Sequence, residues 1–529
     1  MTPADLDDLS VPLERRTGGC FVWKVLTASE LLSPGENGLT DSKGIKDQGL
    51  SRRGFLRSSA GLALTAAAGG ALGATGRAPA ILTVRNPNSK LQVAIVGLGG
   101  ISRGHVAGVS REEHLVALCE VEDSRMERTI GQIKDLERTN VKARDMERFV
   151  DYREMLDAMG DRLDAVIVCT PDHNHACIGM AAIRSGKHTF IEKPMAHNIH
   201  EAYALQEAAR KHRVATQMGN EGHSGEGYRR LCEYIWAGAI GPVTQVYHWC
   251  GRSFGGEDRE LHPVPVREGF NWELWSAPVP QPADVPPGHH IPAGNWRANR
   301  KYGTGNLGDW GCHTMDGAYW ALKIDRAPTW HIECLERLYG GTQQYYRTNT
   351  FKWTIPARAD MPPLTSYWFD GIKPNPDPTG TDADGNPVEH IQNMPQLVEQ
   401  IEAAYGRDFG QFGTIYVGEK GYMFSGGTGG GVRVIPESLH RSIEPPPQTI
   451  PRAEGHNRAE WFHAIRTGEP SSASFEYSSG LTEYVLSGIL AMNAGPGRVV
   501  EYDHANRRVA DPPELNEHIS REYREGFEV

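Results

Sequence analysis

The sequence lacks three features that would each point to a class of protein. It has no excess of positive charge, because 55 lysines and arginines stand against 66 acidic residues for a formal net charge of −11. Nucleic acid is therefore not expected as its main partner. None of its eight cysteines forms a C-x-x-C pair, which argues against a zinc finger, a thioredoxin-like redox site and a dense disulfide framework. No metal site is predicted.

The third missing feature is a run of about 20 strongly apolar residues, the length that a membrane-spanning helix needs. The candidate stretch at 60–74 is made mainly of Ala and Gly, which partition weakly into hydrocarbon. Stable membrane insertion is therefore not expected. With 529 residues, of which 39% are hydrophobic and 23% charged, the chain is longer than one ordinary core and suggests several domains.

The N-terminal residues 1–80 are predicted to be a leader rather than part of the fold. Residues 51–57 contain the adjacent arginines Arg52 and Arg53, the weakly apolar run follows, and Ala78-Pro79-Ala80 offers an A-x-A cleavage site. This pattern is typical of a twin-arginine signal, so we expect an exported, periplasmic protein. Cleavage near Ala74 stays an alternative, and either a long leader or a start codon placed too early would explain the first fifty residues.

Residues 81–219 alternate short apolar runs with helical patterns, which indicates a doubly wound parallel sheet of the Rossmann type. The predicted helices include 176–185 and 198–212. The predicted strands are Leu91–Val96, His114–Cys119, Asp164–Cys169, His188–Ile191 and Val214–Met218.

Residues 220–529 have a different pattern, in which apolar and polar residues alternate as in an antiparallel sheet with one wet face. The segment is predicted to be an α+β domain with a large, mostly antiparallel open sheet that binds substrate and mediates oligomerisation. Gly418–Gly421 is predicted to be a hairpin turn, and the Pro-, Asn- and Asp-rich residues 370–412 an insertion or lid-like loop. The predicted strands are Gly241–Cys250, Thr329–Arg337, Thr348–Ile355 and Thr365–Phe369.

A dinucleotide fingerprint follows the first strand. Gly97 permits the tight turn, and Gly99 lets the backbone approach a pyrophosphate at the start of the next helix. Ser102 stands where the fingerprint has its third glycine. Glu120 ends the second strand at the spacing of a carboxylate that binds the ribose hydroxyls, which favours NAD over NADP because it would repel a 2′-phosphate. The predicted binding residues here are Gly97, Gly99, Gly100, Ile101, Ser102 and Glu120.

Several segments together resemble the Gfo/Idh/MocA family of nicotinamide-dependent sugar and polyol oxidoreductases. The resemblance runs from about Leu91 to Phe527. It rests on DAVIVCTPDHNHA at 164–176, Glu192-Lys193-Pro194, GNLGDWGCHTMD at 305–316, HNRAEW at 456–461 and YREGF at 523–527.

The resemblance implies a catalytic set of Lys193, Asp309 and His313. The i, i+4 spacing of Asp309 and His313 puts both side chains on one helix face. Oxidation of a carbinol needs a group that takes the hydroxyl proton, and His313 is suited to this near neutral pH. Lys193 can stabilise the negative charge that develops on the same oxygen, and Asp309 can orient the substrate or the base.

The resemblance also implies further binding residues. Asn220 falls where the family begins its substrate cleft, and His223 lies just beyond it. An aromatic ring beside a guanidinium suits carbohydrate, so Trp296, Arg297 and Tyr302 are candidate substrate contacts together with His223. The remaining residues expected at the nicotinamide end of the cofactor are Thr170, Pro171, Asn174, His175, Glu192, Lys193 and Asn220.

Three functions remain open at this point. The leading hypothesis is an exported oxidoreductase that acts on a sugar, polyol or glycoside with tightly bound NAD. A redox-neutral NAD-dependent glycosidase or lyase would share the scaffold, although the intact Glu192-Lys193-Pro194 counts against the exported alpha-N-acetylgalactosaminidases of this type. A non-catalytic sugar-binding protein would not need Lys193, Asp309 and His313 together.

The family resemblance further implies a homodimer or homotetramer, because the C-terminal sheets of two subunits commonly pack face to face. The strands carry large aromatic side chains, and an apolar face of that size is usually covered. If the protein is a monomer, the insertion at 370–412 would cap the sheet instead. The aromatic residues concerned are Tyr247, Trp249, Trp353, Tyr367 and Trp368.

Overall fold

The structure is a computed structural model that describes residues 89–136, 141–258, 265–280, 295–377, 379–381, 385–453 and 455–529. The predicted leader at 1–80 lies outside the described residues. The elements below belong to one compact unit. None of the helices in the described ranges is long and apolar enough to cross a membrane.

The N-terminal half contains a six-stranded parallel sheet in the order β3-β2-β1-β4-β5-β6. Its strands are β1 Gln92–Val96, β2 His114–Cys119, β3 Glu147–Phe149, β4 Ala165–Val168, β5 His188–Ile191 and β6 Thr216–Met218. The strand order reverses between β1 and β4, the place where open α/β sheets bind ligands. The predicted Rossmann-type sheet is confirmed, and β3 is an additional edge strand.

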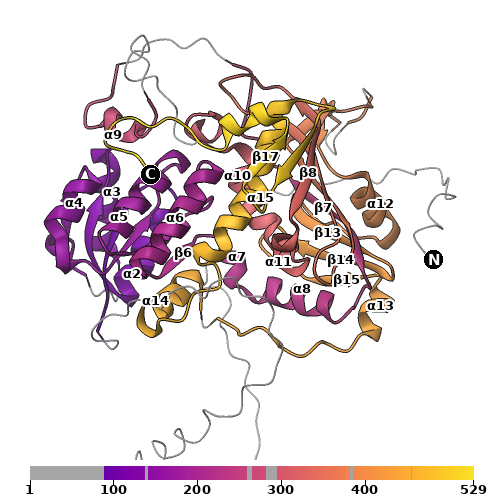
Figure 1. The fold of residues 1–529 in the computed structure, drawn as a ribbon, viewed down its shortest axis with the longest axis horizontal. Helices are drawn as coiled ribbons and strands as arrows, with labels where there is room; N and C mark the ends of the chain where they lie inside the picture. The colour runs from indigo at the N-terminus through magenta and orange to yellow at the C-terminus, as the bar shows by residue number, and fades with distance from the viewer. Residues whose placement is uncertain are drawn as a thin grey trace, which may run out of the picture. The chain divides into compact units, whose positions relative to one another are not determined.

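Helices cover both faces of this sheet (Figure 1). They are α2 Ser102–Glu112, α3 Asp123–Asp135, α4 Tyr152–Met159, α5 Asp172–Arg184 and α6 Ile199–His212. A helix from much later in the chain, α14 Asn457–Thr467, completes the core. Its Trp461 is fully buried, donates from Nε1 to the Ala215 carbonyl at 3.2 Å and meets Phe190 edge to face.

The C-terminal half contains a nine-stranded sheet in the order β15-β14-β13-β7-β10-β9-β8-β16-β17. All its strand pairs are antiparallel except β7 and β10, so the predicted mostly antiparallel sheet is confirmed. The strands are β7 Val243–Cys250, β8 Thr329–Leu338, β9 Thr348–Ile355, β10 Leu364–Asp370, β13 Phe412–Gly418, β14 Gly421–Gly426, β15 Arg433–Ile435, β16 Val499–Asp503 and β17 Arg508–Asp511.

One face of this sheet packs on helix α15, which lies between the two sheets (Figure 1). Trp330, Trp353 and Trp368 are fully buried on this face, and Trp353 Nε1 donates to Ser487 Oγ of α15 at 2.9 Å. The helices of this half are α7 Glu221–Ser224, α8 Glu226–Trp236, α9 Trp272–Ser276, α10 Gly305–Thr314, α11 Asp316–Ala321, α12 Gln396–Tyr405, α13 Glu437–Ser442 and α15 Phe475–Ala494.

The insertion at 370–412 is more than a loop. It holds the short strands β11 Ile372–Pro374 and β12 His390–Gln392 and helix α12, which lies on the sheet face away from α15 (Figure 1). Val398 and Ile401 of α12 pack with Trp249 and Ile415 in a separate buried cluster. Part of the outer sheet face is thus covered within the chain, and the oligomer stays a prediction.

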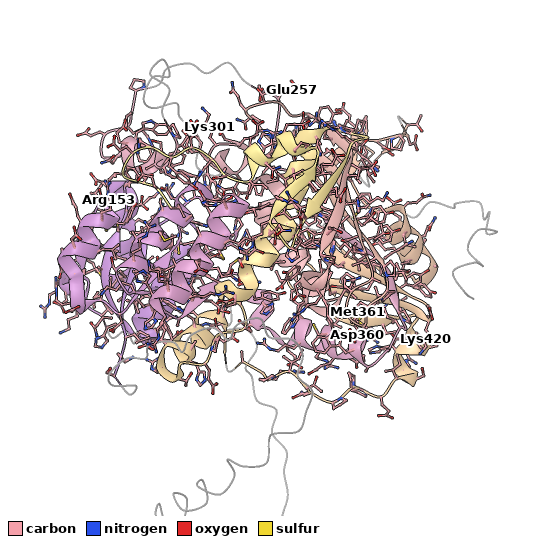
Figure 2. All side chains as sticks on the ribbon, viewed as in Figure 1. Arg153, Glu257, Lys301, Asp360, Met361 and Lys420 are labelled. Atoms are coloured by element: carbon pink, nitrogen blue, oxygen red, sulfur yellow. The ribbon has the colours of Figure 1, made fainter. Side chains whose placement is uncertain are left out.

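The C-terminal tail returns to the Rossmann half. The guanidinium carbons of Arg153 and Arg524 lie 4.4 Å and 4.9 Å from the ring centre of Phe527. Figure 2 shows Arg153 on the Rossmann side of the molecule. The tail therefore packs against the helix that begins after β3.

Candidate active site

A cavity of about 630 Å³ opens at the carboxyl ends of the Rossmann strands. It contains most of the predicted binding residues. Those that line it are Gly97, Gly99, Gly100, Ile101, Glu120, Thr170, Pro171, Asn174, His175, Glu192, Lys193, Trp296 and Arg297. The predicted residues that do not line it are Ser102, Asn220, His223, Tyr302, Asp309 and His313.

The glycine turn after β1 is shaped for a close approach of backbone to ligand. Gly97 has φ +86°, and a Cβ there would lie 2.8 Å from the Thr170 amide nitrogen, so no other residue fits. A Cβ on Gly100 would meet nothing within 4 Å, which leaves open space above the turn. Ser102 is buried beneath it and donates from Oγ to the Gly99 carbonyl at 2.8 Å.

Glu120 lies at the end of β2, where the ribose of a dinucleotide is expected. Its carboxylate accepts from the Leu98 amide at 2.6 Å and from the Val121 amide at 2.9 Å. Burial raises the pKa of Glu120, and these backbone hydrogen bonds oppose the shift. Thr170 Oγ1, also at the cavity, is buried and has no hydrogen-bond partner among the residues that the structure describes. The glycine cradle, the carboxylate and this hydroxyl fit a dinucleotide.

Three charged side chains meet at the other end of the cavity. Lys193 Nζ donates to the Asp309 carbonyl at 2.7 Å and to Asp309 Oδ1 at 3.0 Å. Arg297 Nε donates to the same Oδ1 at 2.8 Å. Burial would raise the pKa of Asp309, but the two positive charges outweigh it and bring that pKa to about 2. Asp309 is therefore a carboxylate that holds both cations in place.

His313 follows Asp309 by one turn of α10, and its side chain is buried. In the described part of the chain its Nδ1 finds no hydrogen-bond partner. Burial and the charge of Lys193 lower the pKa of His313 to about 3. The sequence predicted a pKa near neutrality for His313, which is the value of a histidine in water. The pKa is lower in the fold because the ring is buried. The imidazole is neutral at physiological pH.

Histidine and glutamate side chains fix the loops around Lys193. His175 Nδ1 lies 2.7 Å from the Pro194 carbonyl and Nε2 lies 2.8 Å from the Thr170 carbonyl, so His175 links the turns after β4 and β5. Glu192 Oε1 lies 2.7 Å from His105 Nε2. Burial would raise the pKa of Glu192, but the hydrogen bond from His105 lowers it.

Three predicted substrate-side residues lie in buried clusters instead. Asn220 Nδ2 and His223 Nδ1 both approach the Asp316 carboxylate at 3.0 Å, and His223 also stacks on Trp320 with ring centres 4.2 Å apart. Tyr302 is buried against Trp272 and its neighbours. Their assignment to ligand binding stays a prediction.

Sequence reasoning missed a loop beside α10. Asn306 of α10 donates from Nδ2 to the Arg252 carbonyl and accepts from the Phe254 amide, both at 2.9 Å. The Arg252 guanidinium carbon lies 5.2 Å from the ring centre of Trp310, which meets His313 at 5.8 Å. Only the position of Trp310 beside Asp309 in the sequence hinted at this cluster.

A second missed segment is 265–276, several of whose residues line the cavity. No apolar period marked it in the sequence. No group of three or more His, Cys, Asp or Glu side chains that could hold a metal ion occurs within the described ranges.

Residues 91–220 match the GFO_IDH_MocA family model, described as an oxidoreductase family with an NAD-binding Rossmann fold. The segment is thus similar to the NAD-binding domain of this family, and the predicted cofactor NAD is confirmed. It spans about a quarter of the chain's 529 residues.

Among curated proteins, the chain is similar to inositol 2-dehydrogenase 3 of Saccharopolyspora erythraea, with 28% identity over 210 residues, 36% of this chain and 57% of that protein. It is also similar to inositol 2-dehydrogenase of Salmonella typhimurium, with 26% identity over 180 residues, 33% and 49% of the two chains. A glycosyl hydrolase family 109 protein of Shewanella baltica is 30% identical over 123 residues, 23% and 26% of the two chains. The matches cover little more than half of these relatives, or less.

Solved structures resemble the chain over a longer span. An NAD-binding protein from Listeria innocua matches with a TM-score of 0.50 and 13% identity over 79% of this chain and 99% of its own. The WlbA dehydrogenase from Chromobacterium violaceum, in complex with NADH and UDP-GlcNAcA, matches with the same TM-score and identity over 79% and 97%. At this identity the likeness shows the fold.

Proposed function

We propose that the chain is an exported NAD-dependent oxidoreductase that moves hydride between a hydroxyl-bearing carbon of a sugar, polyol or glycoside and a tightly bound nicotinamide. The proposal rests mainly on one observation: Lys193 and Arg297 both donate hydrogen bonds to Asp309 at the end of the dinucleotide cavity. His313 follows Asp309 by one turn of α10. Export rests on the adjacent Arg52 and Arg53 and the weakly apolar run after them.

Lys193 stabilises the reacting oxygen. An ammonium has three N–H donors, and two of those on Lys193 go to Asp309. The third is available to the substrate oxygen, where a positive charge favours the negative charge that develops during oxidation. When bound, NAD supplies the hydride acceptor.

His313 takes the hydroxyl proton. Because its pKa lies at about 3, the imidazole is neutral and has a free lone pair at every physiological pH. It is a weak base, so the transfer depends on Lys193 lowering the proton affinity of the substrate hydroxyl. Asp309 and Glu192 both raise the proton affinity of His313, so the two carboxylates oppose the penalty from burial. Asp309 thereby orients Lys193 and assists the base.

Trp296 and Arg297 bind the sugar. The guanidinium carbon of Arg297 lies 4.3 Å from the Trp296 ring centre, and both side chains line the cavity. Arg297 uses Nε for Asp309, which leaves its terminal amino groups to donate to substrate hydroxyls.

The test is pre-steady-state reduction of bound NAD, followed by nicotinamide absorbance with candidate sugars and polyols. Lys193→Ala and His313→Ala should each slow the hydride step by about a hundred- to ten-thousandfold, the usual contribution of a positioned acid or base, and leave NAD binding intact. Lys352→Ala and His331→Ala, on the C-terminal sheet strands, serve as matched controls. Reduction of NAD at the wild-type rate in both active-site variants would show that the assignment is wrong.

A second candidate is a redox-neutral glycosidase on the same scaffold. The similarity to a glycosyl hydrolase family 109 protein over 123 residues favours it. Such an enzyme would release an aglycone without net nicotinamide turnover. A substrate deuterated at the oxidised carbon separates the two, because an oxidoreductase passes the label to an acceptor and a redox-neutral glycosidase returns it to the product.

A further inference from the structure

Residues 265–276, which we name the strap, cross from the C-terminal half to the Rossmann half. The strap follows β7 in the chain and includes α9, yet Figure 1 shows α9 beside the Rossmann helices α3 to α5. Val266, Phe270, Trp272 and Trp275 of the strap line the same cavity as the glycine turn. The strap is therefore a wall of the dinucleotide site.

The strap is attached by backbone pairing directly after the ribose carboxylate. The Asn271 amide donates to the Val121 carbonyl at 2.8 Å, and the Asp123 amide donates to the Gly269 carbonyl at 2.9 Å. Gly269 has φ +71°, and a Cβ there would lie 2.8 Å from Asp123 Oδ2. Only glycine permits this close approach, so the sequence of the strap is suited to the contact.

The other end of the strap is attached as firmly. The Trp275 carbonyl accepts from Asn174 Nδ2 at 2.9 Å and lies 2.7 Å from His173 Nε2. Arg524 of the C-terminal tail donates from Nη1 to Glu273 at 2.8 Å. Both attachments hold the strap against the Rossmann half or the tail that packs on it, so its side chains are kept at the cavity.

The first half of the strap combines an aromatic ring with positive charge. The Arg267 guanidinium carbon lies 5.2 Å from the ring centre of Phe270. Arg267 Nη1 lies 3.4 Å from Glu122 Oε1, and Arg125 Nε donates to Glu122 Oε2 at 2.6 Å. A flat ring bordered by guanidinium groups is suited to an adenine base and its neighbouring phosphates.

We propose that the strap completes the nucleotide site by covering the adenosine half of the dinucleotide, and that this cover retains the cofactor through many turnovers. The inference rests on the NAD binding in the proposed function and is independent of the hydride step. Release of the dinucleotide then requires the pairing of Val121 with Asn271 to open. Retention would suit an exported enzyme, because no cytoplasmic nicotinamide pool could replace a lost cofactor.

The sharpest variant is Asn271→Pro. It removes the amide that donates to Val121 and the side chain that accepts from the Leu274 amide at the start of α9. Asn271 has φ −87°, near the range that proline adopts, so the backbone path is kept. Asn271→Ser keeps both the amide and a capping oxygen and is the matched control. Neither substitution touches the Rossmann floor of the cavity.

The measurement is exchange of bound NAD for isotopically labelled NAD in the full-length protein, followed by native mass spectrometry. We expect the wild type and Asn271→Ser to keep their cofactor through gel filtration. Loss of one backbone hydrogen bond and the cap should speed exchange by about tenfold or more in Asn271→Pro. Unchanged exchange in Asn271→Pro, with an unchanged circular dichroism spectrum, would overturn the proposal.

Two side-chain variants test the proposal independently, in case Asn271→Pro does not fold. Phe270→Ala removes the ring, and Arg267→Ala removes the ion pair to Glu122. Both variants should speed the exchange of bound NAD several-fold. The control Arg326→Ala, which breaks the exposed ion pair with Asp325, should leave the exchange rate unchanged. Exchange at the wild-type rate in both would overturn the proposal, as would a wild type that neither carries nor binds NAD(H). Bound NAD that no sugar or polyol reduces would refute the hydride transfer and leave the strap intact.

Discussion

Protonation of His313 is the property of the site that the structure makes most testable. Its pKa falls from 6.5 to about 3 because of burial first and the charge of Lys193 second. The shift is worth about 5 kcal/mol against the charged imidazole at 1.36 kcal/mol per unit. At pH 5 only about one molecule in a hundred would carry the proton. His313 should therefore stay neutral across the range where an ordinary histidine titrates.

The same shift makes a signed prediction for stability. The unfolded chain binds a proton at this histidine near pH 6.5, whereas the folded protein does so only near pH 3. Acid therefore favours the unfolded state, and the stability present above pH 6.5 is lost progressively as the pH falls towards 3. Between pH 7 and pH 5 this one group accounts for about 2 kcal/mol.

The variant that tests both statements is His313→Gln. In protein labelled with ¹⁵N-histidine, the signal that disappears in His313→Gln should show neutral-ring shifts from pH 8 to pH 5. Urea unfolding should show that the wild type loses about 2 kcal/mol more than His313→Gln between pH 7 and pH 5, while His331→Gln on β8 follows the wild type. A signal of His313 that titrates with a midpoint between pH 5.5 and 7.5 would refute the reasoning.

Three further predictions concern the cofactor site and the core. Gly97→Ala should abolish NAD binding in calorimetry, because its Cβ would lie 2.8 Å from the Thr170 amide, whereas Gly131→Ala on α3, whose Cβ would meet nothing within 4 Å and which does not line the cavity, should bind as the wild type does. Glu120→Ala should weaken NAD more than NADP in fluorescence titrations, and equal losses would mean that Glu120 does not bind the ribose. Trp461→Ala should lower the free energy of unfolding by about 3–5 kcal/mol, since the ring is fully buried; a loss below 1 kcal/mol would show that the helix α14 is dispensable.

The buried strands of both sheets could be predicted because burial leaves a strong local pattern. Strand β4 is apolar at every position, and β10 alternates buried with half-buried residues. Strand β3 has the sequence Glu147-Arg148-Phe149 at the sheet edge, where a charged, three-residue strand gives no apolar period. Helix α12 was missed because the Pro-rich segment around it dominated the composition.

Some residues of the candidate site could likewise be predicted from the sequence, and others could not. Gly97 and Glu120 could be predicted because they follow the first two strands at the spacing of a dinucleotide fingerprint, whereas Lys193 and Asp309 were implied by the family resemblance. The strap could not, because Asn271 pairs with Val121, a contact that joins distant segments and depends on no repeat. The low pKa of His313 was also beyond the sequence, since it depends on how deeply tertiary packing buries the ring.

The distant segment HNRAEW at 456–461 belongs to the same electrostatic system as His313. Arg458 Nη1 approaches His105 Nδ1 at 3.5 Å, and His105 Nε2 lies 2.7 Å from Glu192. Arg458 can donate to His105 Nδ1 and His105 Nε2 to Glu192, and the hydrogen bond from His105 lowers the pKa of Glu192. The charge of Glu192 raises the proton affinity of His313 against its burial. A helix near the end of the chain is thus linked to His313 through one imidazole and one carboxylate, and it would support the proton transfer proposed for that residue.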